Sequence, residues 1–176
     1  MFTQKEMGLL EDLKNGEKLC TEKYRKYAQQ ASSPQLQSLF QTISGQEQRH
    51  LQTLEQMASG SSGSGSSQSS SQSSSQGSTM NGSSGSNNQS SSQSSSQSQN
   101  WAQSGNYQGQ DQNYQNDSFL CSDALATEKH VSADYNTCIF EFKDPAVRST
   151  LNSIQQQEQS HGMMLYDYMS ANGMYN

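Results

Sequence analysis

The sequence of 176 residues has little positive charge, only two prolines and no long hydrophobic run. No stretch approaches the ~18 consecutive apolar residues that a membrane-spanning helix needs, so we expect no membrane segment. The net charge is −6 and no basic patch is present, which argues against nucleic acid as a partner. The first six residues, MFTQKE, lack the apolar core of a secretory signal, so we expect no signal peptide.

The near absence of charged residues from one long stretch divides the chain into three parts. Residues 59–118 contain no Lys, Arg or Glu, and their only charged residues are Asp111 and Asp117. Ser, Gln, Gly and Asn dominate this stretch, and such a composition buries too little apolar surface to offset the entropy of ordering. We therefore predict a disordered linker over 59–118. The flanking segments, 1–58 and 119–176, together have enough residues for one compact core.

Cysteine is scarce as well, and its three positions have no metal-type spacing. Cys20, Cys121 and Cys138 are an odd number, which fits reduced thiols in a protein made in the cytoplasm. The alternative is cross-linking after assembly into a larger structure.

What the sequence does contain is an internal repeat. A shift of 111 positions places the second segment on the first without a gap, and it superimposes identical residues. The matched pairs include Glu17 with Glu128, Tyr24 with Tyr135, Pro34 with Pro145, Glu47 with Glu158, and His50 with His161. Two copies of one structural unit are thus joined by the linker.

Each copy shows the periodicity of two helices. Apolar residues recur at alternating spacings of three and four, as in the core stripe of a helix bundle. The first helix is predicted at about 4–30, and the sequences Ser33-Pro34 and Asp144-Pro145 predict the starts of the second and fourth. Gly173 is a plausible stop for the last helix. The predicted fold is all-α: a four-helix bundle made of two repeated helical hairpins, 1–58 and 119–176, with a long disordered crossover.

Charged residues interrupt these apolar stripes. One Glu lies on each stripe where Leu or Ile would be expected, and no Lys or Arg occupies a stripe position. Buried carboxylates need compensating charge, and two divalent cations would balance four of them. The alternative is a relic site, in a structural protein that has kept the ligand residues, whose carboxylates are protonated or solvated. The four are Glu17, Glu47, Glu128 and Glu158.

The spacing of these residues predicts where they meet. Glu17 and Glu47 lie at similar distances from the first turn, so an antiparallel hairpin brings them to the same height. His50 and His161 each follow a stripe Glu by three residues, on the same helical face. One Glu from each of two helices plus Glu-x-x-His from each of the others is a pattern of dinuclear carboxylate sites in ferritin-like bundles. These ligands suit two Fe or two Mn ions.

Other residues near this pattern have open roles. Tyr24 and Tyr135 follow Glu17 and Glu128 by seven residues on the same face, so they would hydrogen-bond a ligand, donate one electron, or serve only as core tyrosines. Cys20 and Cys138 lie on the stripes and are interpreted as packing thiols. His130 lies on another face, where we expect it to be solvated.

The second copy resembles the Coat F domain of spore coat proteins from endospore-forming bacteria. The resemblance spans 123–175 and rests on the segment DALATEKH (residues 123–130), on Tyr135-Asn136, on Asp144-Pro145 and on the ending Tyr168-Met169 through Gly173-Met174-Tyr175. It implies synthesis in the mother-cell cytoplasm, location in the spore coat, and other coat proteins as partners. The linker, with Trp101, Tyr107 and Tyr114, is then a sticky spacer or only a flexible crossover.

Residues 5–58 resemble the first hairpin of rubrerythrin and bacterioferritin relatives. This resemblance implies that Glu17 and Glu128 are terminal carboxylates, Glu47 and Glu158 bridging ones, and the two histidines terminal ligands. The hairpins are somewhat shorter than in those relatives, and rubredoxin-type Cys pairs are absent.

Two hypotheses of function follow. One is a metalloprotein of the spore coat that reacts with peroxide or O₂ as a peroxidase, catalase or ferroxidase and protects the spore. The other is a non-enzymatic building block of the coat with a relic site. A homo-oligomer fits either hypothesis, although the long insert disfavours an iron-storage shell.

Overall fold

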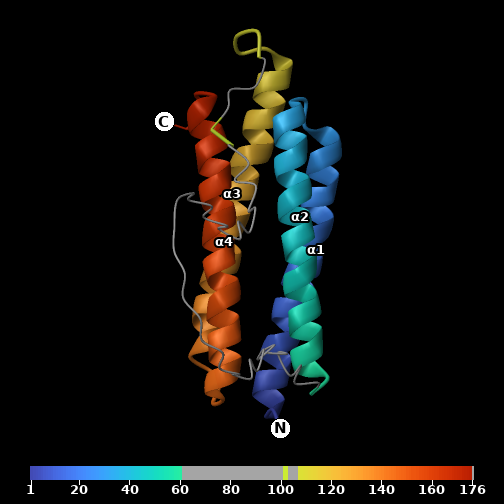
Figure 1. Cartoon of the computed structure of the whole chain (residues 1–176), viewed down its shortest axis with the longest axis vertical. Coiled ribbons are helices and arrows are strands. Elements are labelled where there is room, and N and C mark those ends of the chain that lie inside the picture. The colour runs from blue at the N-terminus through green and yellow to red at the C-terminus, as the bar shows by residue number, and fades with distance from the viewer. Residues whose placement is uncertain (61–100, 103–106, 176) are drawn as a thin grey trace, which may run out of the picture. The chain divides into compact units, whose positions relative to one another are not determined.

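The computed structural model describes residues 1–60, 101–102 and 107–175, and these residues form helices and turns without strands. The helices are α1 (Gln4–Gln30), α2 (Pro34–Ala58), α3 (Gln112–Ile139) and α4 (Pro145–Ala171), all within one compact unit. The predicted all-α four-helix bundle is thereby confirmed (Figure 1). Most of the predicted disordered linker, at 61–100 and 103–106, lies outside the described residues.

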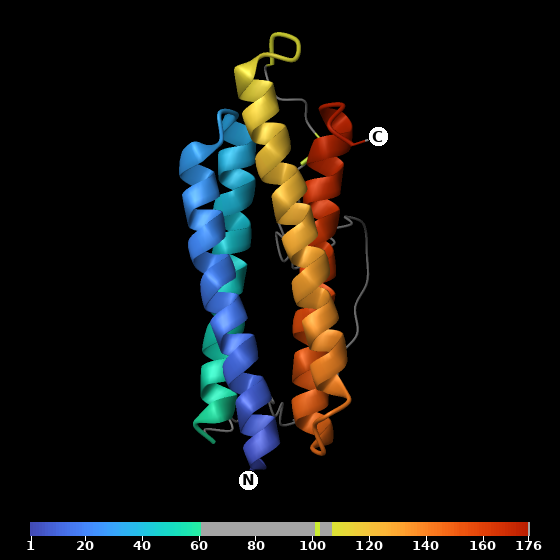
Figure 2. The same ribbon diagram turned by 180° about the vertical axis from the view of Figure 1, so that it is seen from behind.

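The helices pair as two antiparallel hairpins. α1 packs on α2 and α3 packs on α4, and the hairpins meet through α1 against α3 and α2 against α4. Figures 1 and 2 show the two sides of this arrangement, with α2 and α4 together on one side and α1 and α3 on the other. The four helices thus enclose one core to which each contributes a stripe.

Local sequence determines where the helices begin. Thr3 forms a capping box with Glu6 at α1, and Ser33 and Asp144 cap α2 and α4 ahead of proline as the sequence predicts. α1 has the predicted bounds. After α4, Gly173 takes the left-handed conformation with φ 66°, which a glycine adopts without strain.

The start of α3 differs from the prediction. The sequence assigns 59–118 to the linker, whereas α3 begins at Gln112 behind the N-cap Asp111, whose side chain accepts the backbone N–H of Tyr114. The buried Asp117 then ties this first part of α3 to the other hairpin. Polar composition alone therefore places the end of the linker too late.

Two buried carboxylates, one on each hairpin, accept backbone N–H groups from the turn of the other hairpin. We call these hydrogen bonds the cross-hairpin clasps. Asp117, near the start of α3, accepts the backbone N–H groups of Ser32 (2.8 Å) and Ser33 (2.9 Å) in the α1–α2 turn. Glu6, near the start of α1, accepts the backbone N–H of Lys143 in the α3–α4 turn at 3.0 Å. The shift of 111 maps Glu6 onto Asp117, so the clasps are repeat equivalents and hold the hairpins in a symmetric register.

Two apolar clusters fill the core. One contains Tyr24, Phe40 and Leu165, and the other contains Leu10, Leu54 and Leu151. Along α1 and α2 the two clusters lie on either side of Glu17 and Glu47. Val131 of α3, which lies three residues after Glu128, is only half-buried.

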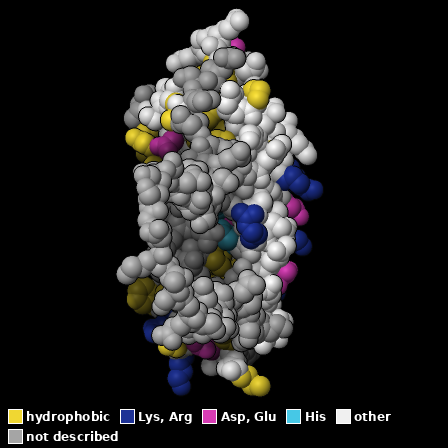
Figure 3. Space-filling model, in the orientation of Figure 1, with side chains coloured by type: hydrophobic (Ala, Val, Ile, Leu, Met, Phe, Trp, Pro, Cys, Tyr) yellow, Lys and Arg dark blue, Asp and Glu magenta, His cyan; other side chains and the backbone are white. Residues whose placement is uncertain are grey.

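Charged side chains are dispersed over the coloured part of the face drawn in Figure 3. Where that face is not grey, the Lys and Arg side chains are few and stand among Asp and Glu. None of the helices in the described part of the chain is apolar enough over sufficient length to cross a membrane.

The three cysteines are free thiols buried in the core. Burial raises the pKa of the Cys20 and Cys121 thiols, and that of Cys138 is raised as well. Buried thiols of this kind are poor nucleophiles, which agrees with a packing role in the folded bundle.

Candidate metal centre

The structure brings all six predicted ligand residues together between the two apolar clusters. Each is at most 3% exposed, and Glu17, Glu47, Glu158 and His161 are fully buried. α1 and α3 provide one Glu each, and α2 and α4 provide Glu-x-x-His each. Among the described residues no buried Lys or Arg accompanies them.

The six residues form two overlapping groups with the geometry of metal ligands. The first consists of Glu17, Glu47, His50 and Glu158, and the second of Glu47, Glu128, Glu158 and His161. In each group, one potential ligand atom per residue lies within 4.8 Å of all the others. Glu47 and Glu158 belong to both groups, so the two groups are contiguous.

The imidazoles turn one particular nitrogen toward the carboxylates. Nδ1 of His50 lies 2.8 Å from Glu158 Oε1, 3.1 Å from Glu47 Oε2 and 3.6 Å from Glu17 Oε2. Nδ1 of His161 lies 3.2 Å from Glu47 Oε1 and 3.4 Å from both Glu128 Oε2 and Glu158 Oε2. Nδ1 is therefore the nitrogen that each histidine offers to its group.

Burial and crowding shift the pKa values of these groups strongly. Burial raises the pKa of Glu17 to about 8 and that of Glu128 to about 7. Burial lowers the pKa of His50, but the carboxylates of Glu158, Glu17 and Glu47 outweigh it and raise this pKa to about 12.

The same balance acts on the remaining groups. The pKa of His161 is lowered by burial and raised more strongly by its carboxylate neighbours, to about 11. Burial opposes ionisation of Glu47, yet the two imidazoles hold the pKa of its carboxyl at about 2. Without metal, the cluster thus retains protons that cations would displace.

Unpartnered atoms test whether metal ions suit this cluster. Seven buried oxygen and nitrogen atoms of the six residues make no hydrogen bond, although all except His161 Nε2 lie within 3.6 Å of an ion-pair partner in the cluster. They are Glu17 Oε2, Glu47 Oε1, Glu128 Oε2, both carboxylate oxygens of Glu158 and both ring nitrogens of His161. Buried polar atoms are rarely left unpaired because the loss of hydration is costly. Carboxylate oxygens and imidazole nitrogens that make no hydrogen bond are donor atoms of the kind that divalent metal ions take.

The two tyrosines contact the terminal carboxylates of the opposite hairpin. Tyr24 donates its hydroxyl to Glu128, and Tyr135 donates its hydroxyl to Glu17. Burial raises the pKa of both phenols, so they remain protonated donors. Of the three roles that the sequence left open, the structure shows the hydrogen bond to a predicted ligand, and in each case the carboxylate lies on the other hairpin.

Two further residues complete the account of the site. His130 lies away from the cluster with a side chain 81% exposed, as predicted. Gln157, for which the sequence predicted no role, approaches His50, with its Oε1 3.2 Å from His50 Nε2. The repeated Gln-Glu pair, Gln46-Glu47 and Gln157-Glu158, was the signal in the sequence.

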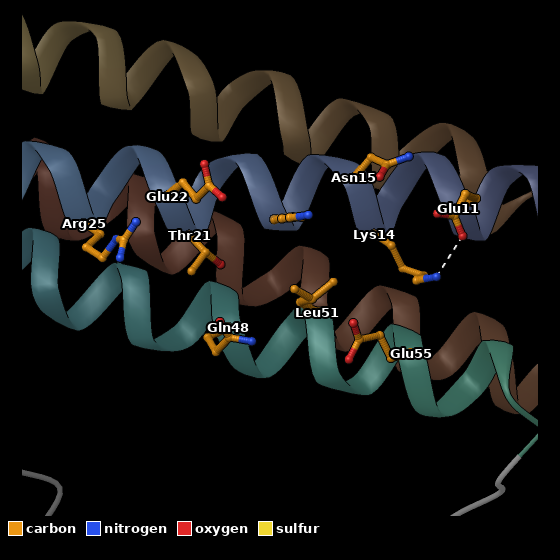
Figure 4. A pocket seen from close by; sticks show the side chains of 10 residues that line it. Glu11, Lys14, Asn15, Thr21, Glu22, Arg25, Gln48, Leu51 and Glu55 are labelled. Carbon is orange, nitrogen blue, oxygen red and sulfur yellow. Dashed lines mark hydrogen bonds and ion pairs between the residues drawn. The ribbon is translucent and has the colours of Figure 1, made fainter.

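One surface groove, on the first hairpin, does not include the cluster. It runs between α1 and α2, and its lining carries both signs of charge, including Glu11, Lys14, Glu22, Arg25 and Glu55 (Figure 4). None of the six predicted ligands lines it. The groove is therefore a mixed-charge surface feature of the first hairpin and separate from the candidate metal centre.

The fold and the cluster together define a helical bundle with a buried carboxylate–imidazole site. Within it, residues 116–176 match the model of the Coat F domain, which confirms the resemblance seen in the second copy. The match covers three of the predicted ligands, Glu128, Glu158 and His161, and leaves out the first hairpin. Neither the curated proteins nor the solved structures contain a match to the chain.

Proposed function

We propose that this chain is a spore coat protein whose bundle binds two Fe or two Mn ions and uses them in reactions with peroxide or O₂. The Coat F match over the second hairpin supports the coat assignment and points to other coat proteins as partners. The observation that carries the metal site is the pair of ligand groups sharing Glu47 and Glu158.

Charge supports the same stoichiometry. Four buried carboxylates with neutral imidazoles balance two divalent ions, whereas one ion leaves two carboxylates uncompensated in a dry core. The ligand pattern is that of dinuclear sites in ferritin-like bundles, to which we assign this bundle. Glu47 and Glu158 would bridge the ions, while Glu17 with His50 and Glu128 with His161 would complete one site each.

The bound ions would supply redox chemistry toward peroxide or O₂: each ion would give one electron, two ions would give the two that peroxide reduction needs, and an external reductant or a second peroxide would return them. The chain's own residues orient and enclose them. Tyr135 and Tyr24 hold the terminal carboxylates by hydrogen bonds, and the apolar clusters on either side exclude water. The resulting activity is of the peroxidase, catalase or ferroxidase type, and it would protect the spore against oxidants.

A second candidate is a structural coat component that uses its metal ions or its relic site only for stability. The observation in its favour is the closure of the cluster: all six ligand residues are nearly or completely buried, and the groove on the first hairpin lies elsewhere. In this case the bundle folds and assembles but does not turn over peroxide.

The deciding experiment is a metal analysis of the chain purified from spores without an affinity tag. We expect about two Fe or Mn per chain by inductively coupled plasma mass spectrometry. Metal below one equivalent, even after anaerobic reconstitution with Fe(II) and Mn(II), would refute the dinuclear site. Peroxide consumption by the loaded protein then separates the two candidates, because the structural one predicts none.

Variants locate the metal. The double substitution Glu47→Ala and Glu158→Ala removes both shared ligands, so we expect it to abolish metal binding. The matched control is Glu22→Ala with Glu55→Ala, which removes two exposed carboxylates from the same bundle and should retain both ions. Full metal content in the first variant would sink the site assignment.

A further inference from the structure

The outer nitrogen of His50 has a specific partner across the bundle. Nε2 of His50, on α2, lies 3.2 Å from the amide oxygen of Gln157 on α4. The amide nitrogen of Gln157 donates to the backbone carbonyl of Ser153 at 3.3 Å, which keeps the amide oxygen turned toward the imidazole. Because an amide oxygen only accepts, the nitrogen facing it must carry a proton.

The repeat places a second glutamine and histidine at equivalent sequence positions, although these two residues do not hydrogen-bond each other in the structure. The shift of 111 maps Gln46 onto Gln157 and His50 onto His161. The Oε1 atom of Gln46 and the Nε2 atom of His161 are both buried without a hydrogen-bond partner. One is an acceptor without a donor and the other a nitrogen able to donate, so they satisfy each other if they pair as the first two do.

We propose that Gln157 and Gln46 are positioning residues that accept the Nε2 protons of His50 and His161 and thereby reserve each Nδ1 for a metal ion. This inference rests on the metal centre proposed above. The hydrogen bond made by one ring nitrogen of a histidine determines which tautomer is present and orients the other nitrogen. The observed direction of both Nδ1 atoms, toward the shared carboxylates, is the direction this tautomer requires.

The choice of an amide has an electrostatic consequence. Glutamine fixes the imidazole without adding charge, so four carboxylates and two divalent ions remain balanced. A carboxylate in the same place would fix the same tautomer but add a negative charge next to the buried cluster, although residue 157 itself is exposed. Gln157→Glu therefore separates orientation from charge: we expect it to keep metal binding, whereas Gln157→Leu removes the acceptor and weakens it.

Metal titration of the full chain tests the inference. His50 and His161 belong to different ligand groups, so each single variant should affect one ion. We expect Gln157→Leu and Gln46→Leu each to weaken one of the two Mn(II) dissociation constants by about 10- to 100-fold. The double variant should weaken both. The controls are Gln159→Leu and Gln48→Leu, which change exposed repeat-equivalent glutamines on the same helices and should alter neither constant.

A second readout needs no metal. In the metal-free chain, the ¹⁵N-resolved ring proton on Nε2 of His50 should exchange with water about ten-fold or more faster in Gln157→Leu than in the wild type, because its hydrogen bond is lost. The proton of His161 should respond to Gln46→Leu. Wild-type protein that binds no metal would refute the metal centre, while this exchange experiment would still decide the histidine–glutamine pairs. Unchanged exchange, or dissociation constants within two-fold of the wild type, would overturn the inference.

Discussion

Removing the metal should reverse the way in which the stability of the bundle depends on pH. Burial raises the pKa of Glu17 from its ordinary 4.5 to about 8, which disfavours the ionised form by about 5 kcal/mol at about 1.4 kcal/mol per pH unit. A group with a raised pKa stabilises the fold below its unfolded value, and that contribution is lost as the pH rises toward its folded value. The metal-free bundle should therefore weaken between pH 5 and pH 8.

The expected size follows from linkage. Glu17 alone accounts for a loss of about 3 kcal/mol in the free energy of unfolding between pH 5 and pH 8. The histidines act in the same direction, because their raised pKa values make their contribution fade above about pH 6.5. Glu47, whose pKa is held at about 2, loses its contribution only as the pH falls below about 4.5, so it does not oppose this trend.

Bound metal gives the opposite slope. The ligands must release their protons to bind, so affinity rises with pH and the loaded bundle gains stability from pH 5 to pH 8. Urea unfolding followed by circular dichroism, with chelator or with excess Mn(II), measures both slopes. Glu17→Gln should flatten the metal-free profile by about 3 kcal/mol. A metal-free wild type that becomes more stable toward pH 8, or a Glu17→Gln profile equal to that of the wild type, would refute the reasoning.

Three further results are expected. Loading two ions at pH 7 should release about two to four protons, counted by calorimetry in buffers of different ionisation enthalpy, because both histidines hold protons in the metal-free cluster; release of fewer than one contradicts this. Tyr135→Phe should cost about 1.5–3 kcal/mol in urea unfolding of the metal-free protein through the lost hydrogen bond to Glu17, whereas Tyr166→Phe, at a half-exposed ring, should cost little. Asp117→Ala should cost about 2–4 kcal/mol in the same assay by leaving two backbone N–H groups unpaired, against no loss for the exposed Asp134→Ala.

Much of the fold could be predicted from the sequence because its determinants are local. The three–four spacing of apolar residues specifies helices, and Ser33-Pro34 and Asp144-Pro145 specify where two of them begin. A single Glu-x-x-His on a helix is a weak sign of a metal site. The repeat strengthens it because the motif occurs twice, at equivalent core positions. The six residues could be grouped from their spacing alone. In an antiparallel hairpin, two residues that are equally far from the turn in sequence lie at the same level along the bundle axis.

What the sequence left open depends on contacts that carry no periodic signal. Asp117 accepts backbone N–H groups of the distant α1–α2 turn. Because every residue type has the same backbone groups, such a contact leaves no signal in the sequence of the turn. The polar neighbours of Asp117 resemble the linker, so the start of α3 was placed too late. The tyrosines were assigned to the correct face, but their carboxylate partners depend on how the hairpins dock. Gln157 approaches His50 for the same reason.

If metal ions bind as proposed, the sharing of Glu47 and Glu158 means that they would hold the two halves of the chain together. Each ligand group takes three residues from one hairpin and one from the other, so neither hairpin completes a site alone. A chain cleaved between residues 60 and 107 would then remain one particle while it is loaded, and chelation would weaken the association of its halves. An uncut chain and bound metal would thus each hold the two hairpins together, and one could partly replace the other.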